Sequence, residues 1–120
     1  MSIRIEFEAE NLIVLRSQGV LMRQEVDAIK RQMHGHMLSH GKQHMLFLID
    51  SNFAGLEALA TWEDIEEDAL IQQQIIRLAV VGDLRWRDRA LLFFLTAVGR
   101  FQVEYFKPEH EPLARAWLLH

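Results

Sequence analysis

Four histidines, His34, His36, His40 and His44, lie close together in the first half of the sequence. Imidazole is a common ligand of divalent transition metals, and the i, i+4 spacing of His36 and His40 places two rings on one face of a helix. A stable metal site needs a third ligand, and no carboxylate follows at a matching spacing. Histidines near the end of a helix also suit its dipole. We therefore expect no cofactor, and a metal site at His36 and His40 stays an alternative.

A second group combines arginines, a tryptophan and a long apolar run. Arg85, Arg87 and Arg89 surround Trp86, and residues 90–95 (ALLFFL) follow. A helix that is apolar nearly all round must bury every face, and in a domain of this size the sheet covers only one of them. The other face would be covered by ordinary core packing, by a second copy of the chain, or by an apolar ligand or lipid. Arginines near a headgroup with a tryptophan at the boundary suit the last of these.

Two further patterns indicate less chemistry. The acidic side chains between residues 57 and 68 have no basic residue among them, follow no calcium-loop spacing and suit the solvated start of a helix. Gly82-Asp83 follows a buried apolar run, which is where open α/β sheets tend to bind ligands. The sequence has no glycine-rich phosphate loop and no Gly-x-Ser-x-Gly elbow. Because no catalytic motif is present, we expect a protein that is not an enzyme.

Composition defines the broad class. The chain has 120 residues, of which half are hydrophobic and a quarter charged, and this predicts one globular domain over residues 1–120. The absence of cysteine excludes disulfides, thiolate metal sites and cysteine nucleophiles. The net charge of −4 gives no general attraction to nucleic acid. The first residues do not resemble a signal peptide, and the apolar run 90–98 is too short to span a bilayer, so we expect a cytoplasmic protein.

Hydrophobic periodicity predicts the first elements. Residues 3–7 alternate apolar and charged side chains, and residues 12–16 follow after a short turn, which predicts an antiparallel hairpin. From residue 22 the apolar side chains recur three or four positions apart until Gly41, as in an amphipathic helix. The predicted apolar face is Met22, Val26, Ile29, Met33 and Met37, and the predicted polar face is Arg23, Gln24, Asp27, Lys30 and Arg31.

The remaining pattern predicts strands at residues 45–50, 75–81 and 102–106, the first of them covered on both faces. Helices are expected at residues 61–74, 86–98 and 108–119, the last with Leu113, Ala116 and Trp117 facing inward. Crossover helices between strands indicate parallel pairing. The predicted fold class is α/β, with a mixed, mostly parallel five-stranded sheet and about four helices in the order ββαβαβα.

The second half of the sequence resembles a known family. The pattern consists of residues 80–86 (VVGDLRW), an apolar helix, residues 103–106 (VEYF) and a closing helix with residues 116–118 (AWL). It is similar to the SpoIIAA-like family, whose fold is like that of the STAS domains of sulfate transporters and anti-sigma-factor antagonists. Gly19 and Leu21 before the first helix, and residues 62–64 (WED) at the start of the second, agree with it. The resemblance implies a non-enzymatic protein that binds nonpolar ligands and associates reversibly with membranes through a movable helical segment.

Ser51 gains a second interpretation from this resemblance. Anti-sigma-factor antagonists carry an Asp-Ser-Ser-Gly step at a strand-to-helix turn, and phosphorylation of its serine switches off a partner interface. In this sequence Asp50-Ser51 matches, but Asn52 follows and the glycine comes only at Gly55. Ser51 is therefore either the phosphorylation site of a partner-switching regulator or an ordinary turn serine after a strand.

The function that we expect first is binding of a nonpolar small molecule or lipid in a cleft between the second and third predicted helices and the sheet. The expected ligand-binding residues are Trp62, Ile65, Arg85, Trp86, Arg89, Phe93 and Phe94. Burial of apolar surface would drive binding, and the two arginines would contact a headgroup. The expected partners are this ligand, a membrane surface or a second copy of the chain, and no nucleic acid. The alternatives are a partner-switching regulator acting through Ser51 and a metal-dependent enzyme using the cluster from His34 to His44.

Overall fold

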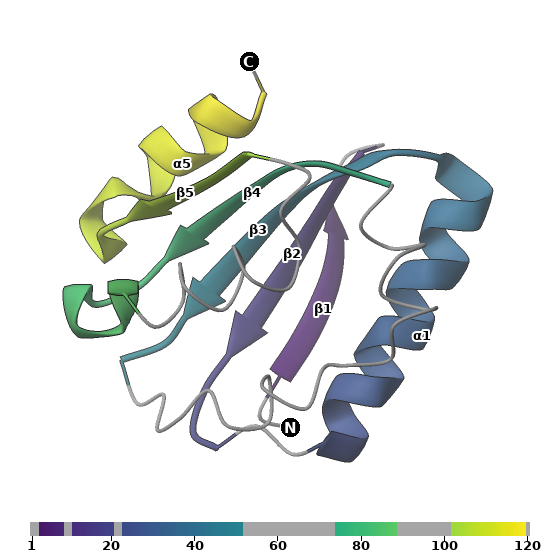
Figure 1. The fold of residues 1–120 in the computed structure, drawn as a ribbon, viewed down its shortest axis with the longest axis horizontal. Coiled ribbons are helices and arrows are strands. Elements are labelled where there is room, and N and C mark those ends of the chain that lie inside the picture. Colours follow the sequence, from purple (N-terminus) through teal and green to yellow (C-terminus); the bar gives the residue numbers. More distant parts are fainter. Residues whose placement is uncertain (1–2, 9–10, 21–22, 52–73, 89–101, 120) are drawn as a thin grey trace.

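The computed structural model describes residues 3–8, 11–20, 23–51, 74–88 and 102–119. Five strands form one sheet: β1 (Ile3–Glu8), β2 (Leu12–Ser17), β3 (Gln43–Ile49), β4 (Ile75–Val81) and β5 (Gln102–Phe106). The described helices are α1 (Arg23–His40), α5 (Glu111–Leu118) and the short 3-10 helices η1 (Leu84–Trp86) and η2 (Pro108–His110). Figure 1 shows the sheet with α1 and α5 on either side of it.

The sheet is mixed, and its spatial order is β1-β2-β3-β4-β5. β1 pairs with β2 in antiparallel fashion, while the pairs β2/β3, β3/β4 and β4/β5 are parallel. This confirms the predicted hairpin and the mostly parallel sheet. The antiparallel pair needs only a short turn, whereas each parallel pair needs a long crossover segment.

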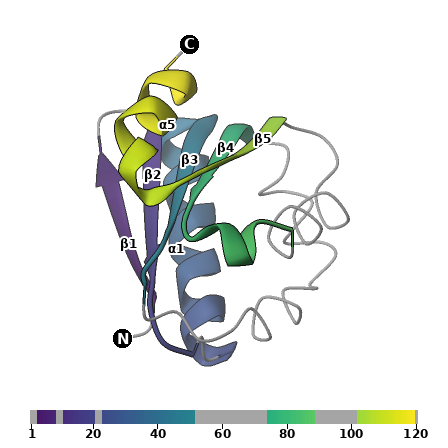
Figure 2. The same ribbon diagram turned by 90° about the vertical axis from the view of Figure 1, so that its left-hand side faces the viewer.

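Helix α1 covers one face of the sheet and α5 covers the other, as the turned view in Figure 2 shows. Successive strand residues point to opposite faces, so the central strands supply two hydrophobic clusters. The cluster on the α1 face contains Ile3, Ile13, Leu15, Ile29, Met33, Met37, Met45, Phe47, Ile49, Leu78, Val80 and Trp86. The cluster on the α5 face contains Leu12, Val14, Leu46, Leu48, Ala79, Val81, Ala114 and Leu118. The prediction of a strand buried on both faces is thereby confirmed for residues 45–49, whereas the predicted last residue, Asp50, is exposed and follows the strand.

The first predicted helix is confirmed with one correction. Helix α1 ends before Gly41, whose φ of +80° suits a residue without a side chain. Ile29, Met33 and Met37 are buried as predicted. Lys30 was predicted on the polar face and is only 2% exposed, because it lies three positions before Met33 and seven before Met37, at the spacing that places side chains on one face of a helix. Met22 and the side chain of Val26 lie outside the described residues.

The number and order of the helices also need correction. The described residues contain two α-helices, not four. The predicted helix 61–74 lies outside them except for its last residue, and so does most of the predicted helix 86–98, whose first residue, Trp86, belongs to η1. The order ββαβαβα contains four strands, one fewer than the sheet.

The last helix has a different buried face from the one predicted. Leu113 is 58% exposed and Ala116 is exposed, whereas Ala114 and Leu118 are buried and Trp117 is half-buried. Both sets follow helical spacing and differ by a rotation of about 100°. The observed rotation lets the small Ala114 approach the sheet closely, and the Arg77 side chain on β4 donates a hydrogen bond of 2.8 Å to the Trp117 carbonyl oxygen.

Gly82, directly after β4, is required by close packing and not by its backbone angles. A Cβ atom at this position would lie 2.8 Å from Ile49 Cβ and 2.9 Å from Tyr105 Oη. Both distances are shorter than those that real Cβ atoms show. The Gly82 amide also donates a 3.0 Å hydrogen bond to the Phe106 carbonyl oxygen. This glycine therefore lets the ends of β3, β4 and β5 approach one another.

We expect Gly82→Ala to reduce the free energy of unfolding by about 1–3 kcal/mol, because the added methyl group overpacks the strand ends. Equilibrium unfolding in urea measures the change. The control is Gly35→Ala inside α1, where nothing lies within 4 Å of the added Cβ. That substitution should stabilise the protein by about 0.5–1 kcal/mol through helix propensity. Wild-type stability of Gly82→Ala would contradict the packing argument.

Candidate functional site

A pocket of about 340 Å³ lies at the edge of the sheet where the parallel strands end. Its lining comes from β1, from the ends of β2, β3 and β4, and from the segment that begins α5. The lining residues are Arg4, Arg16, Ser17, Gln18, Leu48, Ile49, Asp50, Ser51, Val81, Asp83, Pro108 and Glu111. The carboxyl edge of an open α/β sheet is a common place for ligands, and this volume falls in the usual range of small-molecule sites.

Ser51 lies on the rim of this pocket, at the carboxyl end of β3. Its side chain is exposed, and its hydroxyl donates a 3.2 Å hydrogen bond to the carboxylate of Asp50. The guanidinium of Arg85 donates to the Ser51 carbonyl oxygen at 3.3 Å. Ser51 is therefore accessible, with an anionic neighbour on one side and a cationic neighbour on the other.

The segment after β4 is held in place by two hydrogen bonds to Asp83. The Asp83 carboxylate caps η1 by accepting a hydrogen bond from the Arg85 amide at 2.9 Å, and the Asp83 carbonyl oxygen accepts one from the Tyr105 hydroxyl at 2.6 Å. Burial, with a further contribution from the Asp83 charge, raises the pKa of Tyr105 to about 12. Tyr105 therefore stays protonated at neutral pH and keeps its donor role.

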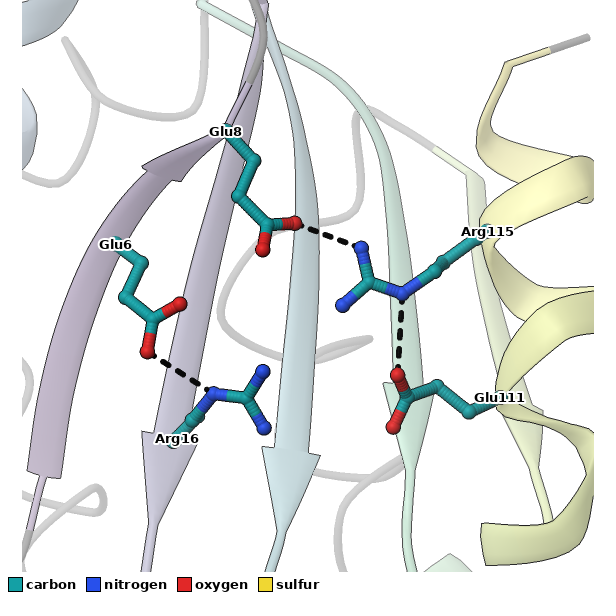
Figure 3. Close-up of polar contacts among 5 residues, drawn as sticks. All are labelled: Glu6, Glu8, Arg16, Glu111 and Arg115. Atoms are coloured by element: carbon teal, nitrogen blue, oxygen red, sulfur yellow. Dashed lines mark hydrogen bonds and ion pairs between the residues drawn. The ribbon is translucent and has the colours of Figure 1, made fainter.

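Two arginines of the hairpin line the other side of the pocket. Arg4 on β1 and Arg16 on β2 are direct partners in the antiparallel register, so their side chains leave the same face of the sheet. Glu6 accepts a hydrogen bond from Arg16 Nε at 3.1 Å (Figure 3). The guanidinium of Arg4 makes no ion pair or hydrogen bond with any residue of the described ranges. This side of the pocket therefore carries a net positive charge.

Arg115 on α5 forms an ion pair with Glu8 on β1 and so connects this helix to the edge strand of the sheet. Its guanidinium donates to Glu8 at 2.7 Å and to Glu111 at 3.1 Å (Figure 3). The hydrogen bond to Glu8, with a smaller contribution from Glu111, raises the pKa of Arg115, although partial burial opposes the shift. Because these side chains are about one third exposed, each pair adds only about 0–1 kcal/mol of stability. Their main effect is to fix Glu111 at the pocket.

Two of the seven predicted ligand-binding residues are described. Trp86 is 9% exposed and packs in the cluster on the α1 face, and the guanidinium of Arg85 lies 5.4 Å from the centre of its ring. The other five, Trp62, Ile65, Arg89, Phe93 and Phe94, lie outside the described residues. The structure thus brings Arg85 to the rim of the pocket beside Ser51, and the apolar cleft stays a prediction.

The histidine pair forms a stack. The His36 and His40 rings are 4.1 Å apart and nearly parallel, and Phe7 stacks on the other side of His36 at 4.0 Å. His40 Nδ1 is hydrogen-bonded to the His36 carbonyl oxygen at 3.1 Å. Within the described residues, no group of three or more His, Cys, Asp or Glu side chains is placed to hold a metal ion. The described contacts of this pair therefore link β1 to α1.

Burial lowers the pKa of His36 below 6.5, His40 lowers it further, and the Gln43 side chain opposes the shift. The unfolded chain then binds more protons than the folded one, so stability should fall as the pH drops below about 6.5. His36→Phe keeps a ring between Phe7 and His40 but cannot be protonated. Its unfolding midpoint should fall less than that of wild type between about pH 7.5 and pH 5.5.

The control for this experiment is His110→Asn, which removes an exposed imidazole on η2, outside the stack of Phe7, His36 and His40. An NMR titration of the imidazole signals gives the pKa of His36 directly. A value at or above 6.5, or an unchanged pH dependence in His36→Phe, would refute the interpretation.

Sequence reasoning predicted Ser51 and Arg85 but missed Arg4, Arg16 and Glu111. A signal for the two arginines was available, because a hairpin with a short turn pairs the start of its first strand with the end of its second. That register places Arg4 opposite Arg16. Glu111 gave no comparable signal, since only the docking of α5 brings it to the pocket.

Comparison with known proteins identifies the family. A family model described as SpoIIAA-like matches residues 12–119, which is nearly the whole chain. The chain therefore belongs to the SpoIIAA-like family, and the resemblance found in its second half is confirmed. Its α/β fold with a mixed five-stranded sheet is consistent with a STAS-like domain. The comparison with curated proteins found no significant match. In the described part of the chain, no helix combines the length and apolarity needed to cross a membrane.

Proposed function

We propose that this member of the SpoIIAA-like family is a non-catalytic regulatory domain that binds a protein partner through the surface around Ser51, under control of Ser51 phosphorylation. The observation that carries the proposal is the exposure of Ser51 on the pocket rim at the carboxyl end of β3. The phosphorylated serine of anti-sigma-factor antagonists also follows a strand, in an Asp-Ser step that Asp50-Ser51 matches. The α/β fold and the family match support a domain that acts by binding.

Phosphorylation at this position would change the local charge strongly. A phosphoryl group adds about −1.5 to −2 charges at neutral pH and removes the hydroxyl proton that Ser51 donates to Asp50. The new dianion would repel the Asp50 carboxylate and attract the guanidinium of Arg85, which already contacts the Ser51 carbonyl oxygen. A partner that docks on the unmodified rim would then meet a different charge pattern.

A second candidate function, contact with a lipid surface, is favoured by a different observation. Leu84 on η1 is 52% exposed and is followed by the exposed cations Arg85 and Arg87. An exposed apolar side chain beside arginines suits the interface of an anionic bilayer. These residues precede the apolar run 90–95, so the observation agrees with the expected binding of a nonpolar ligand or lipid.

Incubation with ATP and the serine kinases of a cell extract should add one phosphoryl group to the wild-type protein, detected by intact-mass spectrometry. Ser51→Ala should gain none. The matched control is Ser39→Ala, which removes an exposed serine hydroxyl on α1 and should still be modified. Equal modification of Ser51→Ala, or an unmodified wild type, would contradict control by Ser51.

Co-sedimentation with vesicles containing phosphatidylglycerol tests the lipid candidate. Leu84→Glu should weaken vesicle binding about tenfold, because it replaces an apolar contact by a repelled carboxylate. Leu113→Glu is the control, since it changes an equally exposed leucine on α5. A wild type that stays in solution, or the same loss in both variants, would count against the lipid surface.

A further inference from the structure

One row of paired residues across the sheet has cations at one end and apolar side chains at the other. The strand registers pair Arg4 on β1 with Arg16 on β2, and Arg16 with Leu48 on β3. Leu48 is paired in turn with Val81 on β4. Residues directly opposite one another point to the same face of a sheet, so all four side chains lie on the face that α5 covers. All four also line the pocket at the carboxyl edge.

The cationic end of this row has unused donors. Glu6 accepts a hydrogen bond from Arg16 and balances only one of the two arginines. Arg4 is exposed, and its guanidinium has no ion pair or hydrogen bond with the described residues. Like charges directly opposite each other in an antiparallel pair are destabilising, so one added negative charge is favourable here. A carboxylate supplies that single charge and matches a guanidinium in shape.

The apolar end of the row determines what the rest of a ligand can be. Neighbouring strands are about 4.8 Å apart, so Val81 lies about 10 Å from Arg16 along the row. A short chain of carbon atoms that begins at a carboxylate on the arginines therefore passes over Leu48 and reaches Val81. The pocket volume of about 340 Å³ suits a small molecule.

Beyond Val81 the pocket lining offers a hydrogen-bond acceptor. Asp83 is exposed, and one of its carboxylate oxygens, Oδ1, accepts from the Arg85 amide. A carboxylate only accepts hydrogen bonds and has about four lone-pair sites for them. A neutral hydroxyl group can therefore donate to Asp83 whatever other contacts this side chain makes. A second carboxylate on the ligand could not, because it has no proton to donate.

We propose that the pocket binds a small hydroxy acid that lies across the strands. Its carboxylate contacts Arg4 and Arg16. Its aliphatic chain packs on Leu48 and Val81, and its hydroxyl group at the other end donates to Asp83. The row of paired residues carries this inference, which goes beyond the proposed function and does not depend on phosphorylation.

Three probes of equal chain length separate the contributions: 6-hydroxyhexanoate, hexanoate and 1,6-hexanediol. NMR titration of the uniformly labelled, unmodified protein should shift the backbone signals of pocket residues such as Ser17 and Val81. Each hydrogen-bonded contact to a charged group contributes about tenfold in affinity. We therefore expect 6-hydroxyhexanoate to bind about tenfold more tightly than hexanoate and at least about tenfold more tightly than the diol.

Two variants should each weaken one contact. Arg4→Gln should weaken both acids about tenfold, because both lose the guanidinium. It breaks no ion pair within the described residues, so the fold should be retained, and a thermal melt checks it. Asp83→Asn keeps an oxygen that can cap η1 but removes the charge, so the advantage of 6-hydroxyhexanoate over hexanoate should fall to about threefold. The matched control is Arg31→Gln, which removes an exposed arginine on α1, on the opposite face of the sheet, and should bind both acids as the wild type does.

The proposal would be overturned by a diol that binds as tightly as 6-hydroxyhexanoate, by shifts that map away from the pocket, or by the absence of any saturable shift. An equal loss of affinity in Arg4→Gln and Arg31→Gln, or an unchanged preference for the hydroxy acid in Asp83→Asn, would also overturn it. The titrations need neither a kinase nor a protein partner. Their failure can therefore be distinguished from a failure of the phosphorylation experiment.

Discussion

Burial of both faces of the central strands is the constraint on which the rest of the structure depends. β3 and β4 present apolar side chains alternately to α1 and to α5, so neither strand can leave the middle of the sheet without exposing a hydrophobic cluster. This keeps the two strands side by side in the middle of the sheet, and the long connection between them allows the parallel pairing that is observed. Their carboxyl ends must then lie at one edge, which is where the polar residues that follow them, Asp50, Ser51 and Asp83, come together.

The hairpin brings cations to the same edge through its antiparallel pairing. β2 runs parallel to β3, so its end, with Arg16, lies near Asp50. β1 runs the opposite way, and therefore its start, with Arg4, meets the end of β2. A parallel β1 would have placed Arg4 at the far edge. The separation of positive and negative side chains in the pocket is thus a consequence of strand direction and order.

Much of the sheet could be predicted because its patterns are local. Residues 3–7 alternate, and the runs 45–50 and 75–81 are apolar except for Asp50 and Arg77, so the presence of these strands follows from period and spacing. It was harder to predict from the sequence which face of each helix is buried. The last helix has two apolar stripes one residue apart, and its contacts with the sheet decide between Ala114 and Leu113. Lys30 has an apolar stem and a charged end, so its burial depends on what packs beside it.

The candidate site could be predicted only where one segment contains the signal. Ser51 comes two residues after the end of the apolar run 45–49, and its position at the end of a strand was evident. The bonds that complete the site join distant segments: Arg85 to Ser51, Tyr105 to Asp83, and Arg115 to Glu8.

The location of Trp86 could not be predicted from the sequence. A tryptophan beside arginines occurs both at a membrane surface and in a hydrophobic core where a cation packs on the ring. Its packing with the α1 cluster supports the second arrangement for this side chain, while Leu84 beside it stays exposed. Among the described residues, the surface of this pocket therefore combines the charged rim with the apolar side chains of Leu48 and Val81.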